Sequence, residues 1–340
     1  MFSEDYISFL LKGKIATDGE ATDVYYDNGY VYVADGSNGL VVIDPGLQDK
    51  DNTKYKVSPS IKGTCAVTGT AVKVVVSGNY AYVAAKDGGL SIVDISDPAD
   101  PTVAGAIAGT DISDARSVRV SGNYAYVADG ANGLKVVNIS DKSDPVLAGS
   151  TALDGTAMDL SIAGTRAYVA AGSGGFHVVD ISDPTAPERF SGYAQPPYDN
   201  DVKGIYAAIS DADSSYTLIW VSAGENGLAF FSHPPGVGPQ YIAGADSYGD
   251  AKQTAVFGDY AFIADSADGL LATMVNTQSG QTDSWDWLSG VVPTNLHQVI
   301  YTSEGAGCMV ECIDGREKHS VWGIFKNMFD KVQKLVEPWL

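Results

Sequence analysis

Carboxylates are the side chains with the most chemical potential in this sequence. It holds 42 Asp and Glu residues against 21 Lys and Arg residues, which gives a formal net charge of −21 at pH 7. A surface of this charge repels nucleic acid and anionic lipid. We therefore expect cations, basic proteins or neutral ligands as partners, and no nucleic acid. Many aspartates stand in turn sequences such as 96–98 (SDP), where Asp bonds to its own backbone, so turn chemistry and solubility explain part of the excess.

Two loops carry acids at spacings that suit a calcium ion. In residues 211–215 (DADSS), Asp211, Asp213 and Ser215 offer oxygens at alternate positions. Residues 49–53 (DKDNT) are similar but include a lysine that would oppose a cation. Both loops lack the glycine and the distal bidentate glutamate of an EF-hand, and a plain hairpin tip is the alternative interpretation for each. Calcium is the one cofactor that the sequence suggests.

The remaining reactive residues indicate no enzyme. Cys308 and Cys312 lie four apart on a predicted strand, where the strand rise separates them by about 13 Å, too far for a disulfide. With Cys65 the count is odd, so a fully paired disulfide framework is excluded. The four histidines are scattered, and neither a nucleophile elbow nor a phosphate loop is present. The sequence therefore names no catalytic residue.

An internal repeat supplies the elements that must position the acids. Each copy has an aromatic and β-branched run, a glycine-containing turn and a second apolar run, which predicts two strands around a tight turn. The glycine before the second run supplies the backbone freedom that such a turn needs. The copies are residues 30–44, 80–94, 124–138, 166–180 and 260–274, with a sixth at 218–231.

Further strands flank each hairpin. Apolar stretches such as 71–77 and 117–121 precede the hairpins, and short strands such as 102–107 and 146–150 follow Asp-Pro punctuation. Four antiparallel strands in about 40–45 residues make a propeller blade. The fold is therefore predicted to be an all-β propeller over residues 1–324.

Ring closure decides the expected number of blades. Residues 7–16 precede the first inner strand as 102–109 precede a later one, so they are predicted to be the outer strand of the last blade. Closure of this kind removes free sheet edges and predicts seven blades, with six as the alternative. The last blade would use 297–302, 308–312 and 320–325.

The C-terminal segment 325–340 differs from the repeats. Its apolar residues, Phe329 and Trp339 among them, recur at helical spacing opposite three lysines, which predicts an amphipathic helix. This helix either packs on the propeller or docks a partner. No apolar run is long enough to span a membrane. The N-terminus lacks the basic region of a signal peptide, so the protein is either cytosolic or numbered from a start after a removed signal.

Blade geometry predicts where the acids gather. The turn between the second and third strands lies on the same rim as the link into the next inner strand. We therefore expect an acidic face around the channel mouth that contacts a partner. The turns carry Asp35, Asp87, Asp129, Glu225 and Asp265, and the links carry Asp23, Asp111, Asp114, Asp154, Asp159, Asp199, Asp201, Asp246 and Asp250.

The segments 92–98 (IVDISDP), 178–184 (VVDISDP) and 126–141 (YVADGANGLKVVNISD) resemble the LVIVD repeat of bacterial and archaeal cell-surface proteins. The resemblance covers about residues 20–275 and is weak in the fifth and sixth blades. It implies a propeller fold and an extracellular or cell-surface location. It says little about function, because propellers host many roles.

Three functional hypotheses follow. The first is a non-catalytic surface propeller that binds a protein or glycan through its acidic face. The second is a structural subunit that self-assembles into a surface layer or extracellular filament. The third is a metal-dependent hydrolase or lyase that uses carboxylates at the channel mouth.

Overall fold

The computed structural model describes nine stretches of the chain and contains only β-strands as regular elements in them. These are residues 15–48, 56–57, 59–190, 201–210, 215–245, 250–257, 260–265, 269–274 and 301–302. They form six sheets of three or more strands and one two-stranded hairpin.

Each large sheet contains an antiparallel meander in chain order. The first contains β1 (Asp23–Asp27), β2 (Tyr30–Ala34), β3 (Leu40–Asp44) and β6 (Ser60–Cys65), and the second β7 (Lys73–Ser77), β8 (Tyr80–Ala84), β9 (Leu90–Asp94) and β10 (Thr102–Ile107). The third contains β11 (Ser117–Ser121), β12 (Tyr124–Ala128), β13 (Leu134–Asn138) and β14 (Val146–Thr151), and the fourth β15 (Asp159–Ala163), β16 (Arg166–Ala170), β17 (Phe176–Asp180) and β18 (Glu188–Arg189). The fifth contains β19 (Gly204–Ile209), β20 (Thr217–Ser222), β21 (Leu228–His233) and β22 (Gln240–Ala245), and the sixth β23 (Ala251–Phe257), β24 (Tyr260–Asp265) and β25 (Gly269–Met274).

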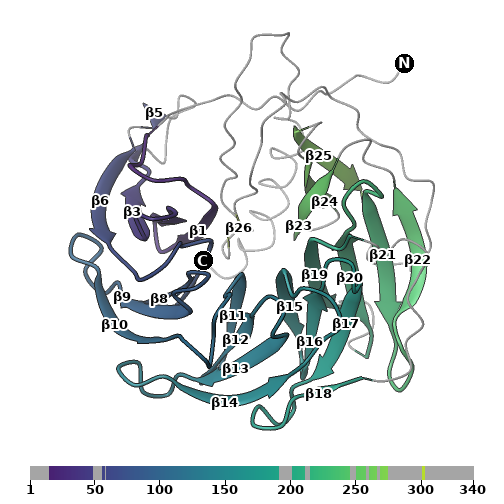
Figure 1. Ribbon diagram of the computed structural model, residues 1–340. Helices are drawn as coiled ribbons and strands as arrows, with labels where there is room; N and C mark the ends of the chain where they lie inside the picture. The colour runs from purple at the N-terminus through teal and green to yellow at the C-terminus, as the bar shows by residue number, and fades with distance from the viewer. Residues whose placement is uncertain are drawn as a thin grey trace, which may run out of the picture.

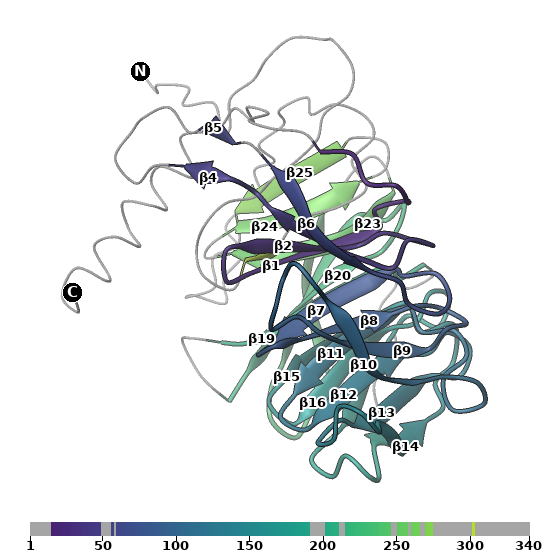
Figure 2. The same ribbon diagram turned by 90° about the vertical axis from the view of Figure 1, so that its left-hand side faces the viewer.

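The sheets are arranged around a common centre. Figure 1 shows β11, β15, β19 and β23 towards the centre, and β1 beside the central β26. In the second sheet β7 is the corresponding strand, and the last strand of each four-stranded sheet is outermost. Neighbouring inner strands contact each other in order from β1 through β7, β11, β15 and β19 to β23, and Figure 2 shows the sheets stacked face to face. The fold is therefore a β-propeller, as the repeat predicts.

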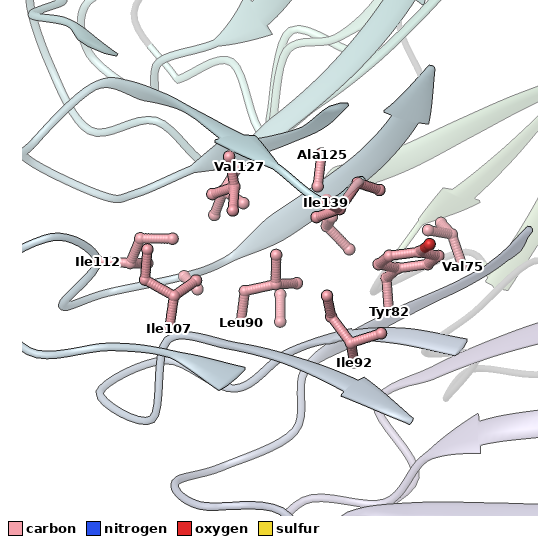
Figure 3. Packing of buried hydrophobic residues seen from close by; sticks show 13 residues of the cluster. Val75, Tyr82, Leu90, Ile92, Ile107, Ile112, Ala125, Val127 and Ile139 are labelled. Atoms are coloured by element: carbon pink, nitrogen blue, oxygen red, sulfur yellow. The ribbon is translucent and has the colours of Figure 1, made fainter. Parts of the chain in front are cut away.

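Apolar side chains fill the space between neighbouring sheets. Figure 3 shows Tyr82, Leu90 and Ile92 of the second sheet against Val127 and Ile139 of the third, all buried. Both faces of the second to fifth sheets are covered in this way, so their middle strands are continuous apolar runs such as 80–84 (YAYVA). Burial of each such side chain contributes about 1.5–3 kcal/mol, so packing between adjacent sheets dominates the stability of the ring.

A second contact joins the sheets at the outer edge. Gly105, at a bulge in β10, lies so close to the third sheet that a Cβ there would be 2.3 Å from the Lys142 carbonyl oxygen and 3.0 Å from Pro145 Cδ. Gly63 and Gly149 stand at the same point of β6 and β14 and face the proline turns of the next sheets. The proline-containing turn of one blade thus packs against a glycine in the outer strand of the preceding blade. We call this contact the outer plug.

The number of blades is not decided by the described residues. They contain six sheets, and the predicted N-terminal outer strand 7–16, most of the predicted last blade and the predicted helix 325–340 lie outside them. From the predicted strand 297–302, Tyr301–Thr302 is present as β26, which pairs in parallel with β1. The insertion after β3 begins and ends in the hairpin β4 (Leu47–Gln48) and β5 (Lys56–Val57).

Candidate binding face

One face of the propeller is formed by the turns between second and third strands together with the links into inner strands; we call it the link face. A backbone bridge joins each turn to the link of the next sheet, as Gly36 joins Ala71 and Gly130 joins Ala157. Equivalent bridges occur at Lys86, Gly172 and Gly224. The prediction that turns and links share a rim is therefore confirmed for these five junctions.

The turns of the link face repeat one backbone conformation. In the first sheet, Gly36 and Gly39 have φ values of 58° and 80°, in the left-handed region. The N–H of Asp35 donates to the Gly39 carbonyl at 2.8 Å, and the second to fifth sheets repeat this hydrogen bond at 2.7–2.9 Å. The glycine before each second apolar run thus has the role that the sequence predicts.

Lys86 is the exception in this pattern. It has a φ of 46° at the position where four other turns have glycine with φ of 52–58°. Left-handed backbone costs a residue with a Cβ about 1–2 kcal/mol. The side chain of Lys86 is exposed and makes no ion pair with any described residue. Lysine at a glycine position of the repeat is the sequence signal that points to this residue.

Three of the predicted partner-binding acids are buried. Asp35, Asp129 and Asp265 are 0%, 1% and 0% exposed. Asp35 accepts hydrogen bonds from Thr17 Oγ1 at 2.6 Å, the Gly19 N–H at 2.9 Å and Asn38 Nδ2 at 2.8 Å. These carboxylates hold the links in place and do not present charge to a ligand.

Asp129 and Asp265 make the same type of contact in their own sheets. Asp129 accepts from the N–H groups of Ser113 and Asp114 at 3.0 and 2.6 Å. Asp265 accepts from the Asp250 N–H at 3.0 Å. We call a buried aspartate at this position, with the hydrogen bonds that it accepts from the link, a latch. In the second, fourth and fifth sheets a buried alanine stands at this position, so only some blades have a latch.

A second set of link-face acids is exposed. Asp87, Asp111 and Glu225 are exposed, and none of them forms a hydrogen bond or ion pair with a described residue. Asp114 and Asp201 are partly exposed and paired, with Arg116 at 2.8 Å and Lys203 at 2.9 Å. The structure therefore separates the acids of the link face into buried carboxylates that hold the backbone, partly exposed carboxylates paired with basic residues, and exposed carboxylates that remain available in solution.

The basic residues of the link face are mostly used by neighbouring acids. Lys203 contacts both Asp201 and Asp250, and Lys252 also contacts Asp250. Burial lowers the pKa of Lys203, but the hydrogen bonds to Asp250 and Asp201 outweigh it and raise the pKa above its ordinary value. Arg189 pairs with Asp154 at 2.7 Å. These pairs leave the negative charge of the face in excess.

Polar groups near the centre link the inner strands. Asp23 of β1 accepts from the Val74 N–H of β7 at 2.9 Å and lies 3.3 Å from Lys73 Nζ. Burial raises the pKa of Asp23 despite the opposing charge of Lys73. In the same way, Ser117 Oγ donates to Asp159 at 2.7 Å and Arg119 lies 3.7 Å from that carboxylate. Both link acids thus serve the contact between adjacent blades.

The opposite face, made of the turns between first and second and between third and fourth strands, is also acidic. Asp94 accepts from the Ser96 N–H at 2.9 Å, and Asp180 accepts from the Ser182 N–H at 2.8 Å. Hydrogen bonds from these serines hold the pKa of both aspartates below the ordinary value. Turn chemistry therefore explains much of the aspartate content, and the acidity is not confined to the link face.

Several predicted residues lie outside the described part of the chain. These are Asp211 and Asp213 of the proposed calcium loop, Asp199 and Asp246 of the links, and Phe329 and Trp339 of the predicted helix. Ser215 is exposed just before β20. Among the described residues, no three or more His, Cys, Asp or Glu side chains gather as a metal site would require. Calcium binding stays a prediction.

Buried histidines and the cysteine have structural surroundings. His177 Nε2 lies 2.9 Å from the Asp154 carbonyl oxygen, and burial lowers the pKa of this histidine. His233 Nδ1 lies 2.9 Å from Tyr168 Oη, across the boundary between the fourth and fifth sheets. Cys65 is a buried free thiol whose pKa burial raises. In the described residues we find no helix of the length and apolarity that a membrane crossing needs.

Solved structures of distant sequence share this fold. A chain of the mitotic checkpoint complex aligns with a TM-score of 0.65 at 13% identity, covering 92% of this chain and 94% of that one. The computationally designed Ika8 protein aligns with a TM-score of 0.59 at 10% identity, covering 87% and 81%. The Cps50 (Swd1) β-propeller domain of Myceliophteria thermophila gives 0.51 at 14% identity, covering 65% and 71%. At such identities the likeness concerns the fold alone.

Comparison of sequences gives the family. None of the curated proteins matches this chain. The LVIVD repeat matches five times, at residues 18–44, 68–108, 112–152, 154–194 and 248–272. The first four matches each cover at least the hairpin of one blade, the fifth ends within β25, and together the matches span just over half of the sequence. The chain therefore belongs to the LVIVD repeat family.

Proposed function

We propose that this propeller is a non-catalytic binding protein of the cell surface, and that its link face contacts a protein or glycan partner. The observation that carries the proposal is the division of link-face acids into two sets. Buried Asp35 and Asp129 fix the loops, whereas Asp87, Asp111 and Glu225 are exposed without a partner among the described residues. A rigid rim that carries unpaired charge suits recognition of a basic surface.

Electrostatic attraction fixes the kind of partner that we favour. The excess negative charge favours a basic protein, or a glycan that carries amino groups, and the attraction must weaken as salt screens it. Lys86, exposed beside Asp87, adds a single positive charge to this surface. We infer that Lys86 contacts an acidic or carbonyl group of the same partner, because a strained conformation is retained there.

The experiment compares two variants of equal charge. The first replaces the link-face acids (Asp87→Asn, Asp111→Asn, Glu225→Gln), and the second replaces three exposed acids of the opposite face (Asp100→Asn, Asp144→Asn, Glu188→Gln). Binding of the purified proteins to cell envelopes of the source organism is measured against salt concentration. We expect the first variant to lose most of the salt-sensitive binding and the second to retain it. Equal binding by the two variants, or none by the parent chain, would overturn the proposal.

Lateral assembly is the second candidate function. Ile61, Val103, Val146 and Tyr241 lie on outer strands and are exposed, although they are large and apolar. Exposed edge strands with apolar residues favour pairing with another copy. Sedimentation velocity at rising protein concentration tests this role. Concentration-dependent oligomers that disappear with Val103→Lys would support it, whereas a monomer at all concentrations would exclude it.

A further inference from the structure

A single tripeptide of the sequence has the form Asn-x-Ser/Thr, at Asn138-Ile139-Ser140. This is the acceptor motif for N-linked glycosylation, and it requires an accessible surface position. Asn138 is the last residue of β13, and the turn to β14 follows on the opposite face. The repeat offers an internal comparison, since the same position is aspartate in β9 and β17.

The turn itself does not require asparagine. Asn138 Oδ1 accepts from the Ser140 N–H at 2.9 Å, and Asp94 and Asp180 make the same bond to Ser96 and Ser182. A carboxylate accepts such a bond more strongly than a neutral amide, and the hydrogen bonds from Ser96 and Ser182 accordingly lower the pKa of Asp94 and Asp180. Asparagine is therefore the weaker choice for the turn, and what it adds is the amide nitrogen.

That nitrogen is accessible. Because the Ser140 N–H is bonded to Oδ1, Nδ2 occupies the other branch of the amide, and it has no hydrogen-bond partner among the described residues. Asn138 is partly exposed and Ser140 is exposed, whereas Ile139 between them is buried and fixes the turn. The motif is thus presented in one conformation on a rigid support.

We propose that Asn138 is a site of N-linked glycosylation. In this group transfer, Nδ2 attacks the anomeric carbon of a lipid-pyrophosphate-linked oligosaccharide. The new N–C bond forms as the C–O bond to the pyrophosphate breaks, the lipid pyrophosphate leaves with the electron pair, and a base of the transferase takes the amide proton. The glycan projects from the opposite face and leaves the link face clear. The inference rests on the surface location in the proposed function, because the transferases act outside the cytosol.

The test uses the protein isolated from envelopes of its own cells. Trypsin releases residues 136–142 as one peptide, whose mass shows directly whether Asn138 carries sugar. We expect this peptide to carry a hexose-containing mass, and we expect Asn138→Gln and Ser140→Ala to run as smaller proteins. Ser140→Ala is the sharper control, because it removes the motif but keeps the backbone N–H that forms the turn.

The outcomes separate the two claims. If the chain is found in the envelope and peptide 136–142 has only its unmodified mass, glycosylation is wrong and the proposed surface function stands. If the chain is found only in the cytosolic fraction, the surface function fails, and the glycosylation inference fails with it. Asn138→Asp introduces the residue that the other repeats have at this position, so it should keep the turn and the fold while it removes the amide. If this variant folds and lacks sugar, the loss of sugar does not result from unfolding.

Discussion

The N–H of Asp114 lies 2.6 Å from Oδ1 of Asp129, and this bond ties a loop of the link face to the turn beside it. Asp129 is buried, whereas Asp114 is partly exposed and pairs with Arg116. Two acids that the sequence predicts on the same face therefore have different roles. One positions the backbone, and the other contributes to the charge of the surface.

Removal of the Asp129 carboxylate, which forms a latch, should destabilise the propeller through lost hydrogen bonds and not through a steric clash. Alanine fits the position, since Ala85 and Ala171 occupy it in other sheets. Asp129→Ala leaves the N–H groups of Ser113 and Asp114 without their acceptor, which costs about 1–3 kcal/mol. Urea unfolding measures this loss. The exposed Asp87→Ala is the control and should change the free energy of unfolding by less than about 0.5 kcal/mol. Similar losses in both variants would argue against the latch.

Relief of strain at Lys86 should stabilise the chain. Lys86→Gly removes the cost of left-handed backbone, partly offset by the greater freedom of glycine in the unfolded chain, for a net gain of up to about 1 kcal/mol. Lys86→Ala removes the charge and keeps the strain, so it should give no gain. Gly172→Ala supplies the reverse change, because a Cβ there meets nothing closer than 3.7 Å at a φ of 56°. Thermal unfolding of the three variants checks the signs, and a stabilised Lys86→Ala would contradict the explanation.

The outer plug should be destabilised when a single methyl group is added to its glycine. In Gly105→Ala the new Cβ would overlap the Lys142 carbonyl, and overpacking of this kind costs about 1–3 kcal/mol. Ala106→Ser, at the next and exposed position of β10, is the matched control and should be neutral. Denaturant midpoints of the two variants give the comparison. A neutral Gly105→Ala would mean that the Asp-Pro turn does not bear on β10.

Acid should weaken the boundary between the fourth and fifth sheets through His233. Burial, with a smaller effect of Arg166, lowers the pKa of His233 to about 4, whereas an unfolded histidine titrates near about 6.5. Between these values the unfolded chain binds a proton that the folded chain does not. The free energy of unfolding therefore falls as pH drops from about 6.5 to about 4, by up to about 3 kcal/mol.

A variant with a neutral side chain isolates the contribution of His233 to this pH dependence. His233→Gln cannot titrate, so its stability should fall less steeply over the window, measured as urea midpoints from pH 7 to pH 4.5. His177, whose pKa burial also lowers, is present in both proteins and cancels in the difference. Parallel curves for the parent and the variant would show that His233 is not the acid-sensitive group.

The repeat made the fold predictable, because each blade restates the same spacing of apolar runs and glycines. The strands 102–107 and 117–121 agree with β10 and β11 residue for residue. The acids were harder to interpret. Asp35 and Asp87 stand in equivalent turns, two positions apart when the repeats are aligned, yet Asp35 points into the rim and Asp87 into solvent. That difference depends on which loop N–H groups lie opposite, which a one-dimensional pattern does not give.

Carboxyl footprinting of the protein, alone and bound to cell envelopes, tests the central claim most directly. Carbodiimide-driven labelling read by peptide mass reports the accessibility of each acid. We predict that Asp87, Asp111 and Glu225 label in the free protein and are protected in the bound state. Asp35 and Asp129 should stay unlabelled in both states, and Asp100 and Asp144 should label in both. Protection of Asp100 and Asp144 instead, or labelling of Asp129 in the folded chain, would contradict the division between structural and binding acids.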